Sequence, residues 1–275
     1  MKRPVELILF AGLAGDRNDR AMAGAALLAD TLGAVTGLQP TILGAKRMPL
    51  PGGWAAQLRA ASEELRLLAT ATDQALGEGK AIISTMGRCA AGLATLPVIA
   101  RHHPDAVVVW FDAHGDCNVP LGRSPESYLG GMVLTGAAGM WNTGLGGDLD
   151  LANVILVGSR NLDPPEQDLL SSNALRLVKG GPDLAGRLSA EIAGRPVYIH
   201  IDCDVLDPGI VPTEYSVAAG LTIADLAEAC AALAGCNVIG MEIAEFEATW
   251  PEGRAADPAL LEQALAPLLD VLVPD

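Results

Sequence analysis

The sequence predicts an α/β fold, with helices on both faces of a doubly wound, mainly parallel sheet. Short apolar runs typical of buried strands alternate along the chain with segments whose apolar residues recur at helical spacing. Half of the 275 residues are hydrophobic, which is enough for a sizeable core. No linker, repeat or low-complexity tract divides the chain, so we expect residues 1–275 to form a single domain.

The expected strands are short apolar runs that end at glycine, polar or acidic residues. They cover residues 6–10, 40–43, 81–84, 106–111, 152–158, 197–201 and 238–243. The first follows Met1-Lys2-Arg3, an arrangement that resembles a signal peptide. Pro4 and Glu6 interrupt its apolar run, however, and a buried strand explains the segment better.

The expected helices cover residues 21–37, 54–76, 90–101, 184–193, 223–233 and 258–272. In the second of these, Leu58, Ala61, Leu65 and Leu68 recur at helical spacing with charged residues between them. Residues 115–130 and 144–150 carry no such pattern and are expected to be irregular.

Composition limits the classes of partner. The 18 basic and 33 acidic residues give a net charge of −15, which opposes binding to nucleic acid or to an anionic membrane and favours small cationic molecules. No stretch is long and apolar enough to span a bilayer. Five cysteines without regular spacing indicate reduced thiols and a cytoplasmic protein. The sequence leaves open whether the chain forms a homo-oligomer.

Two acidic motifs follow predicted strands. Asp112, His114 and Asp116 come after the strand at 106–111, and Asp202 and Asp204 come at the end of the strand at 197–201. If the chain stays extended, alternation places the members of each motif on one side. Buried carboxylates without compensation cost roughly several kcal/mol each, so the cluster requires cations, and hard divalent metals fit oxygen ligands. Parallel sheets place ligands at the carboxyl ends of their strands, where Cys89, Asp163 and Glu245 are also expected.

The two motifs, Asp-Ala-His-Gly-Asp at 112–116 and Asp-Cys-Asp-Val-Leu-Asp-Pro at 202–208, resemble the signatures of the ureohydrolase (arginase and agmatinase) family. The resemblance covers nearly the whole chain in element order. It implies a three-layer, arginase-like α/β fold that holds two Mn²⁺ ions. By this resemblance Asp112 and Asp202 would bridge the ions, His114 and Asp204 would complete one, and Asp116 would bind the other.

The same resemblance implies how substrate binds. Glu245 is similar to the family's guanidinium-contacting carboxylate, and Asp163 to the arginase residue that receives the α-amino group. Asn118 is similar to the residue that binds the α-carboxylate, with Arg123 or Ser124 as helpers. These residues favour an amino-acid substrate over agmatine.

Two departures from the family pattern narrow the expected substrate. Where the family has Gly-Asp-His, this chain has Gly-Arg-Cys, which puts Cys89 in a ligand position. The loop at 127–131 lacks the arginase histidine, and its loss at Gly130 is expected to provide room. A cysteine at that ligand position, inside an otherwise arginase-like amino-acid site, resembles the branch of the family that serves D-cycloserine biosynthesis by hydrolysing Nω-hydroxy-L-arginine to L-ornithine and hydroxyurea. His200 is expected to point away from Asp202, which leaves His114 as the histidine ligand.

The predicted chemistry is metal-assisted hydrolysis of a guanidine C–N bond, with Asp116, Glu245 and His114 as the catalytic residues. Two alternatives remain open. One is an arginase or another hydrolase of guanidino acids, and the other is a degenerate, non-catalytic member of the family.

Plainer structural roles remain for several of these residues. Asp163 precedes a proline and serves equally well in a turn. Buried free cysteine is usually inert filler, but the position of Cys89 in the family pattern favours the ligand role. Asp207, before Pro208, is assigned a structural role. Glu242 and Glu247 are expected to be solvated. Packing roles are assigned to Cys117, Cys203, Cys230 and Cys236.

Overall fold

A single eight-stranded sheet runs through the part of the chain described in this computed structural model, which covers residues 3–50, 52–120 and 128–273. Its order is β2-β1-β3-β8-β7-β4-β5-β6, and every neighbouring pair is parallel. The strands are β1 (Val5–Phe10), β2 (Thr41–Leu43), β3 (Ala81–Met86), β4 (Val107–Phe111), β5 (Val154–Val157), β6 (Arg176–Val178), β7 (Val197–Asp202) and β8 (Val238–Ala244). The predicted doubly wound parallel sheet is confirmed.

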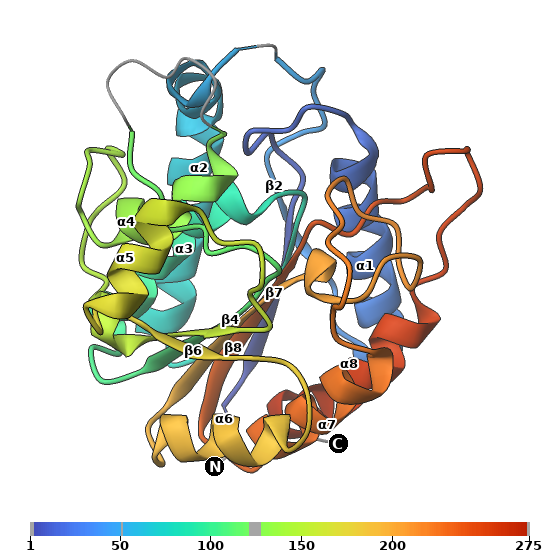
Figure 1. The fold of residues 1–275 in the computed structure, drawn as a ribbon. Coiled ribbons are helices and arrows are strands. Elements are labelled where there is room, and N and C mark those ends of the chain that lie inside the picture. The colour runs from blue at the N-terminus through green and yellow to red at the C-terminus, as the bar shows by residue number, and fades with distance from the viewer. Residues whose placement is uncertain (1–2, 51, 121–127, 274–275) are drawn as a thin grey trace.

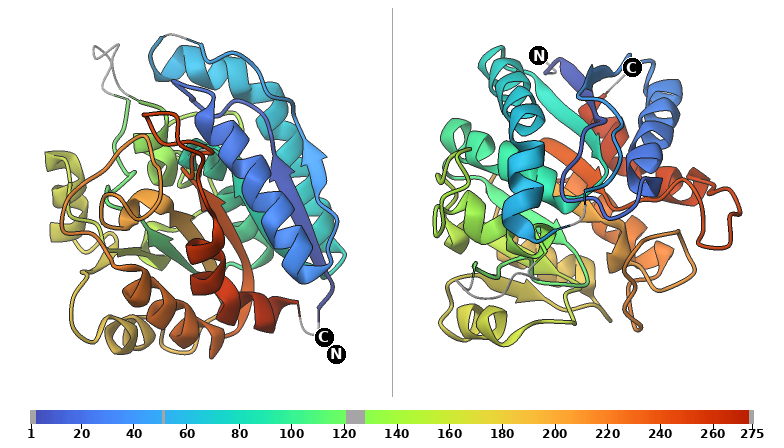
Figure 2. Two further views of the ribbon diagram at one scale, coloured as in Figure 1. Left: turned by 90° about the vertical axis from the view of Figure 1, so that its right-hand side faces the viewer. Right: turned by 90° about the horizontal axis from the view of Figure 1, so that it is seen from above.

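Helices cover both faces of the sheet, which gives the expected three layers (Figures 1 and 2). One layer packs through α1 (Arg20–Thr36), α6 (Leu184–Ile192), α7 (Ile223–Ala234) and α8 (Ala259–Leu272). The other packs through α2 (Trp54–Gly77), α3 (Gly92–His102), α4 (Val133–Ala137) and α5 (Pro164–Ser171). Each layer buries its apolar side chains against one face of the sheet.

Strand β4 illustrates why the central strands read as unbroken apolar runs. Val107, Val109 and Phe111 belong to the core under α6, α7 and α8, whereas Val108 and Trp110 belong to the core on the α2 and α3 side. A parallel strand covered on both faces has no solvent side, so polar alternation disappears.

Three elements were not predicted. Helix α4 has five residues and strand β6 has three, too few to establish a period. Helix α5 begins at the double proline Pro164-Pro165, where the side chain of Glu166 accepts a hydrogen bond from the backbone N–H of Asp163 at 2.8 Å. Proline at the first helical position with an acid two residues later is a start signal that the sequence carried.

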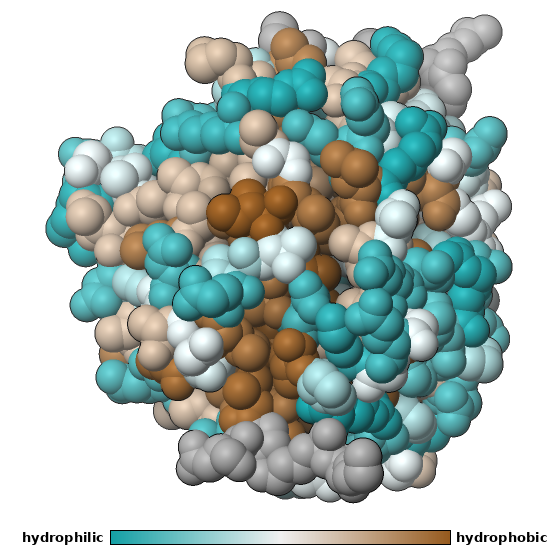
Figure 3. All heavy atoms as spheres, turned by 180° about the vertical axis from the view of Figure 1, so that it is seen from behind, coloured by the Kyte–Doolittle hydropathy of each residue, from teal (hydrophilic) through white to brown (hydrophobic). Residues whose placement is uncertain are grey.

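Apolar residues also lie on the outer surface of the molecule. Seen from behind, one face carries a central patch of hydrophobic residues bordered by hydrophilic ones (Figure 3). Among the described helices, none combines the length and the apolar character needed to cross a bilayer.

The four central strands, in the order β3, β8, β7 and β4, bring the predicted site residues together. Cys89 opens a short 3₁₀ helix just after β3, and Glu245 directly follows β8. Asp202 ends β7, and Asp112 directly follows β4. Because all four strands are parallel, these residues share one edge of the sheet.

A glycine in α1 helps to position the segment that follows Glu245. A Cβ atom on Gly24 would overlap the carbonyl oxygen of Phe246 and lie 2.7 Å from its carbonyl carbon. Only a residue without a side chain therefore lets α1 pack this closely against the end of β8.

We predict that Gly24→Ala destabilises the protein by about 3 kcal/mol, because the clash is with backbone that cannot rotate away. Urea unfolding measures the change. Gly77→Ala, at the end of α2, is the matched control: nothing lies within 4 Å of its added Cβ, and we expect a change below about 1 kcal/mol. Equal stability of the two variants would contradict the close packing.

Candidate metal centre and substrate pocket

Turns after the strands, rather than extended chain, bring the acidic side chains together. Strand β4 ends at Phe111, and Asp112 Oδ1 then accepts a hydrogen bond from the backbone N–H of His114 at 2.6 Å. Asp202 Oδ1 likewise accepts one from the N–H of Asp204 at 2.7 Å. The expectation that alternation in an extended chain aligns each motif is wrong, because both motifs turn within two residues.

Two of the candidate residues have unusual backbone conformations. Asp116 has φ 49° and Glu245 has φ 65°, both in the left-handed region that residues with a side chain rarely adopt. Such strain persists where the surrounding structure imposes it, and it is common at functional sites.

The ligand-type atoms of seven buried or half-buried residues fall into groups that could hold metal ions. Within each group the atoms lie within 4.8 Å of one another. The groups are Asp112, His114 and Asp204; Cys89, Asp112 and Asp116; and Cys89, Asp202 and Glu245. All six predicted metal ligands belong to at least one group.

The electrostatics of this cluster fit a bound cation. Burial and the nearby charge of Asp112 raise the pKa of Asp116 well above its ordinary value. Burial and the charge of Asp204 do the same to the pKa of Asp202. Although burial opposes it, contacts with Asp112 and Asp204 raise the pKa of His114 to about 11. Without cations, burial and crowding therefore favour the protonated forms of Asp116 and Asp202, and divalent ions would displace those protons.

Cys89 lies fully inside this cluster. Its Sγ atom is 3.0 Å from Asp202 Oδ2 and 3.2 Å from His200 Nε2. The expectation that His200 points away from Asp202 is wrong, because residues two apart in a strand share one face. Burial raises the pKa of the Cys89 thiol well above its ordinary value, as does the charge of Asp202.

A closed polar network supports His200 from behind. Glu242 Oε1 lies 2.7 Å from His200 Nδ1, and Glu242 Oε2 accepts hydrogen bonds from Tyr198 and Thr95, each at 2.7 Å. The indole of Trp110 stacks on the imidazole with centroids 3.4 Å apart. Glu242 is 0% exposed, so the expectation that it is solvated is wrong.

The buried guanidinium group of Arg88 pairs with the Glu245 carboxylate. Arg88 is 0% exposed, and its Nη1 lies 2.5 Å from Glu245 Oε2, while Glu245 Oε1 accepts a hydrogen bond from the N–H of Cys89 at 3.2 Å. Arg88 also pairs with Asp16 at 3.3 Å and Glu214 at 2.5 Å. Burial raises the pKa of Glu245 to about 7, opposed by Arg88.

Glu247 lies in the same charged region. It is 0% exposed and pairs with Arg20 at 2.7 Å, so the expectation that it is solvated is also wrong. Sequence reasoning missed the whole Arg88 network, since its members are far apart along the chain.

The other end of the pocket holds the residues predicted to bind the amino-acid portion. Asn118 Nδ2 donates to Asp163 Oδ2 at 2.8 Å. Glu166, which sequence reasoning missed, accepts from the backbone N–H of Cys117 at 3.0 Å and of Asp163 at 2.8 Å. It thereby ties the loop after β4 to the start of α5. Ser124 and Arg123 lie outside the described residues.

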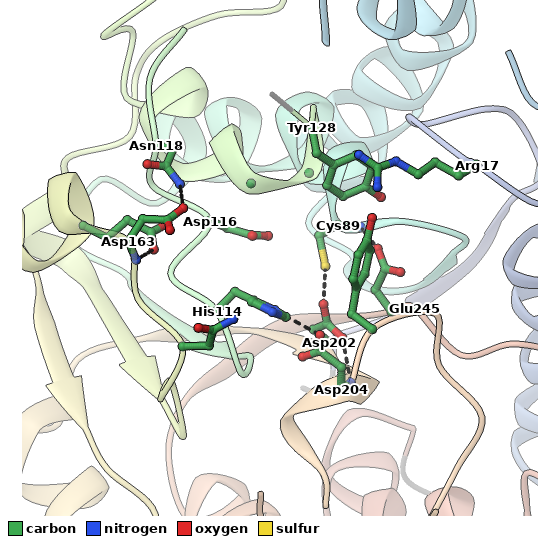
Figure 4. Close-up of a pocket in the computed structure, with 15 residues that line it drawn as sticks. Arg17, Cys89, His114, Asp116, Asn118, Tyr128, Asp163, Asp202, Asp204 and Glu245 are labelled. Atoms are coloured by element: carbon green, nitrogen blue, oxygen red, sulfur yellow. Dashed lines mark hydrogen bonds and ion pairs between the residues drawn. The ribbon is translucent and has the colours of Figure 1, made fainter. Parts of the chain in front are cut away.

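One cavity of about 220 Å³ joins the metal-ligand groups to the residues predicted to bind substrate (Figure 4). Those that line it are Cys89, His114, Asp116, Asn118, Asp163, Glu166, Asp202, Asp204 and Glu245. Arg17, Tyr128 and Tyr215 also line it, and none of them was predicted. The expected room at Gly130 is filled, because a Cβ there would clash with the ring of Tyr128. The sequence held one signal for Arg17, which comes after the first strand at the same edge of the sheet.

The remaining predictions concern single residues. Asp207 accepts a hydrogen bond from the N–H of Gly220 at 2.9 Å, in line with a structural role. All five cysteines lie in the described residues and are free. Cys117, Cys203 and Cys230 are buried in the two cores, and Cys236 packs against one of them.

Comparison with known proteins identifies the family. Residues 34–259 match the family model described as Arginase family. The chain belongs to the arginase family. This family depends on a binuclear metal centre, and the groups around Asp112 fit such a centre.

Named relatives match between two thirds and nearly all of this chain. The Nω-hydroxy-L-arginine amidinohydrolase of Streptomyces lavendulae is 36% identical over 270 residues, which is 98% of this chain and 96% of that protein. The arginase of Bacillus caldovelox is 28% identical over 66% of each chain. The arginase fold is also seen in the Entamoeba histolytica arginase crystallised with L-ornithine, with a TM-score of 0.81, 18% identity and coverage of 100% and 99% of the two chains.

We predict that the metal-free arginase-family protein loses stability as pH rises from 5 to 7.5. A carboxyl group whose pKa is raised by folding stabilises the fold below its unfolded value, and this contribution is lost as pH rises through the folded value. For Glu245 that window runs from 4.5 to about 7, and Asp116 and Asp202 act in the same direction. Thermal unfolding after chelation measures the trend, and a saturating divalent cation should flatten it. A melting temperature that rises over this range would contradict the charge crowding.

Proposed function

We propose that this protein is a binuclear manganese amidinohydrolase that cleaves Nω-hydroxy-L-arginine to L-ornithine and hydroxyurea. The observation that carries the proposal is the cluster of carboxylates, imidazole and thiol at the base of an amino-acid-sized cavity. The full-length similarity to a relative named for this activity supports the substrate.

The donor set supports manganese as the metal. Carboxylates outnumber the single imidazole and thiol, and oxygen-rich sites suit hard divalent ions. Asp112 belongs to two of the groups, as a bridging ligand would. His114 and Asp204 would complete one ion, and Cys89 and Asp116 the other. Asp202 would be the second bridge, because it contacts Cys89 on one side and Asp204 on the other.

Bound metal ions supply a nucleophile at neutral pH by lowering the pKa of water. The water oxygen becomes the carbonyl oxygen of hydroxyurea, and the C–N bond to the δ-nitrogen of ornithine breaks. Asp116, which burial keeps basic, takes the proton from water and delivers it to the leaving nitrogen. His114 and Glu245 complete the catalytic set, with Glu245 facing the terminal nitrogens of the substrate.

The opposite end of the cavity suits the amino-acid portion. Asn118 and Asp163 lie across the pocket from Arg17 and Glu245 (Figure 4). The Asp163 carboxylate would bind the α-amino group and the Asn118 amide the α-carboxylate, with Ser124 as a helper. A substrate extended between the two ends places its guanidine carbon over the metal groups.

The proposal extends to the setting of the reaction. Release of hydroxyurea is a step expected of antibiotic biosynthesis of the D-cycloserine type. The free cysteines support a cytoplasmic location. The sheet that joins both halves of the chain supports one domain over residues 1–275.

We predict that the manganese-loaded protein forms ornithine and hydroxyurea from Nω-hydroxy-L-arginine with a kcat/KM at least about tenfold above that for L-arginine. Product quantification by mass spectrometry, with both substrates in parallel, measures this. Equal or better use of L-arginine would reassign the protein as an arginase. Inactivity on both substrates, with less than one metal ion bound per chain, would indicate a degenerate family member.

We also predict that Asp116→Asn lowers kcat by about 100-fold or more, since the amide cannot accept the proton from water. Steady-state ornithine release measures the loss. Asp168→Asn, the same change at an exposed position of α5, is the matched control and should keep the wild-type rate. A normal rate in the Asp116 variant would exclude the proton-transfer role.

A further inference from the structure

Tyr128 is held rigidly at the Glu245 end of the pocket. Its ring lies against Gly130, where any Cβ would clash with it. The guanidinium of Arg17 lies over the same ring at 4.7 Å, and the Tyr215 ring is 5.7 Å away, centroid to centroid. A ring fixed by these neighbours is preorganised and loses little freedom when it binds a ligand.

The hydroxyl of Tyr128 is buried and finds no hydrogen-bond partner among the described residues. A buried hydroxyl without a partner costs free energy, which a ligand that supplies one would recover. The charged groups that affect it most are Glu245 and Arg88, since burial and the Glu245 carboxylate raise the pKa of this phenol well above its ordinary value. Tyr128 and Glu245 line the same cavity, and both lie on its side away from Asn118 and Asp163, where the guanidine group would bind (Figure 4).

Tyr215 provides a comparison within the same wall. Among the described residues its hydroxyl is also buried without a partner, and the charge that raises its pKa most, after burial, is that of Glu214. Its ring lies 6.1 Å from His114 at 79°, edge to face. Of the two phenols, Tyr128 is the one whose ring lies against Gly130, closer to the Arg17 guanidinium, at 4.7 Å against 5.9 Å for Tyr215.

The hydrogen-bonding groups at the guanidine end of the substrate determine whether it can bond to the Tyr128 hydroxyl. The terminal nitrogens of a guanidinium only donate hydrogen bonds, and Arg88 already adds positive charge beside Glu245. An N-hydroxyl adds an oxygen that accepts as well as donates, which matches a phenol. Sites built to bond a substrate hydroxyl discriminate against the analogue that lacks it.

We propose that Tyr128 determines the substrate specificity of this site, its hydroxyl forming a hydrogen bond to the oxygen of the substrate's N-hydroxyl group. The inference rests on the proposed function and adds the residue that distinguishes a hydroxyguanidine from a guanidine. Tyr128 thereby takes the place in the pocket that the missing loop histidine leaves.

Tyr128→Phe tests the proposal, with Tyr215→Phe as the matched control. With manganese-loaded protein, we expect Tyr128→Phe to lower kcat/KM for Nω-hydroxy-L-arginine about tenfold, the effect of one hydrogen bond, and to change that for L-arginine less than about twofold. Tyr215→Phe should keep the wild-type ratio of the two values. An equal loss on both substrates, or no loss on either, would overturn the specificity role.

A binding measurement separates this inference from the proposed function. Calorimetric titration of the metal-loaded Asp116→Asn protein with Nω-hydroxy-L-arginine and with L-arginine gives Kd values without turnover. Adding Tyr128→Phe should weaken binding of the hydroxylated ligand about tenfold and leave L-arginine nearly unchanged. If the wild type hydrolyses neither compound, the proposed function fails, yet this titration still decides the role of Tyr128. Equal Kd values with and without the Tyr128 hydroxyl would refute it.

Discussion

Charge compensation at one edge of the sheet is the constraint on which the rest of this structure depends. Four central strands end together and bring buried acidic side chains into a small volume: Asp112, Asp116, Asp202, Asp204 and Glu245. Buried like charges raise one another's pKa and oppose folding unless cations or protons balance them. Arg88 supplies one internal positive charge, and His114 supplies a second when it is protonated. A metal pair would replace the protons on the remaining carboxyl groups, so ligand binding and stability are linked.

Cys89 changes the character of this site without removing it. A thiol is smaller than an imidazole, and behind it His200 fills the space and closes a buried network through Glu242 to Tyr198 and Thr95. The network holds Cys89 from the core side while Asp202 holds it from the pocket side. Such outer contacts fix the orientation of metal ligands.

The two ends of the pocket differ in kind. The end at Asn118 and Asp163 is polar and built on the start of α5, which suits the charged ends of an amino acid. At the other end Glu245 pairs with the buried Arg88, and Arg17 and Tyr128 lie on the same side of the pocket as Glu245 (Figure 4). An arginine paired with this carboxylate makes this end less attractive to a cation than an isolated glutamate would be. A less basic hydroxyguanidine fits such surroundings better than a guanidinium.

The sequence by itself determined the alternation of strands and helices, the parallel sheet, and the acidic residues that gather at its edge, because these depend on local periodicity and on where each strand ends. It did not reveal α4 and β6, which are too short to show a period. It also misjudged His200, Glu242 and Glu247, whose partners are far away in the chain. The tertiary structure alone decided that Arg88 pairs with Glu245 and that Tyr128 fills the space at Gly130. Those contacts join separate loops, and no local pattern records the distance between loops that only the packed sheet brings together.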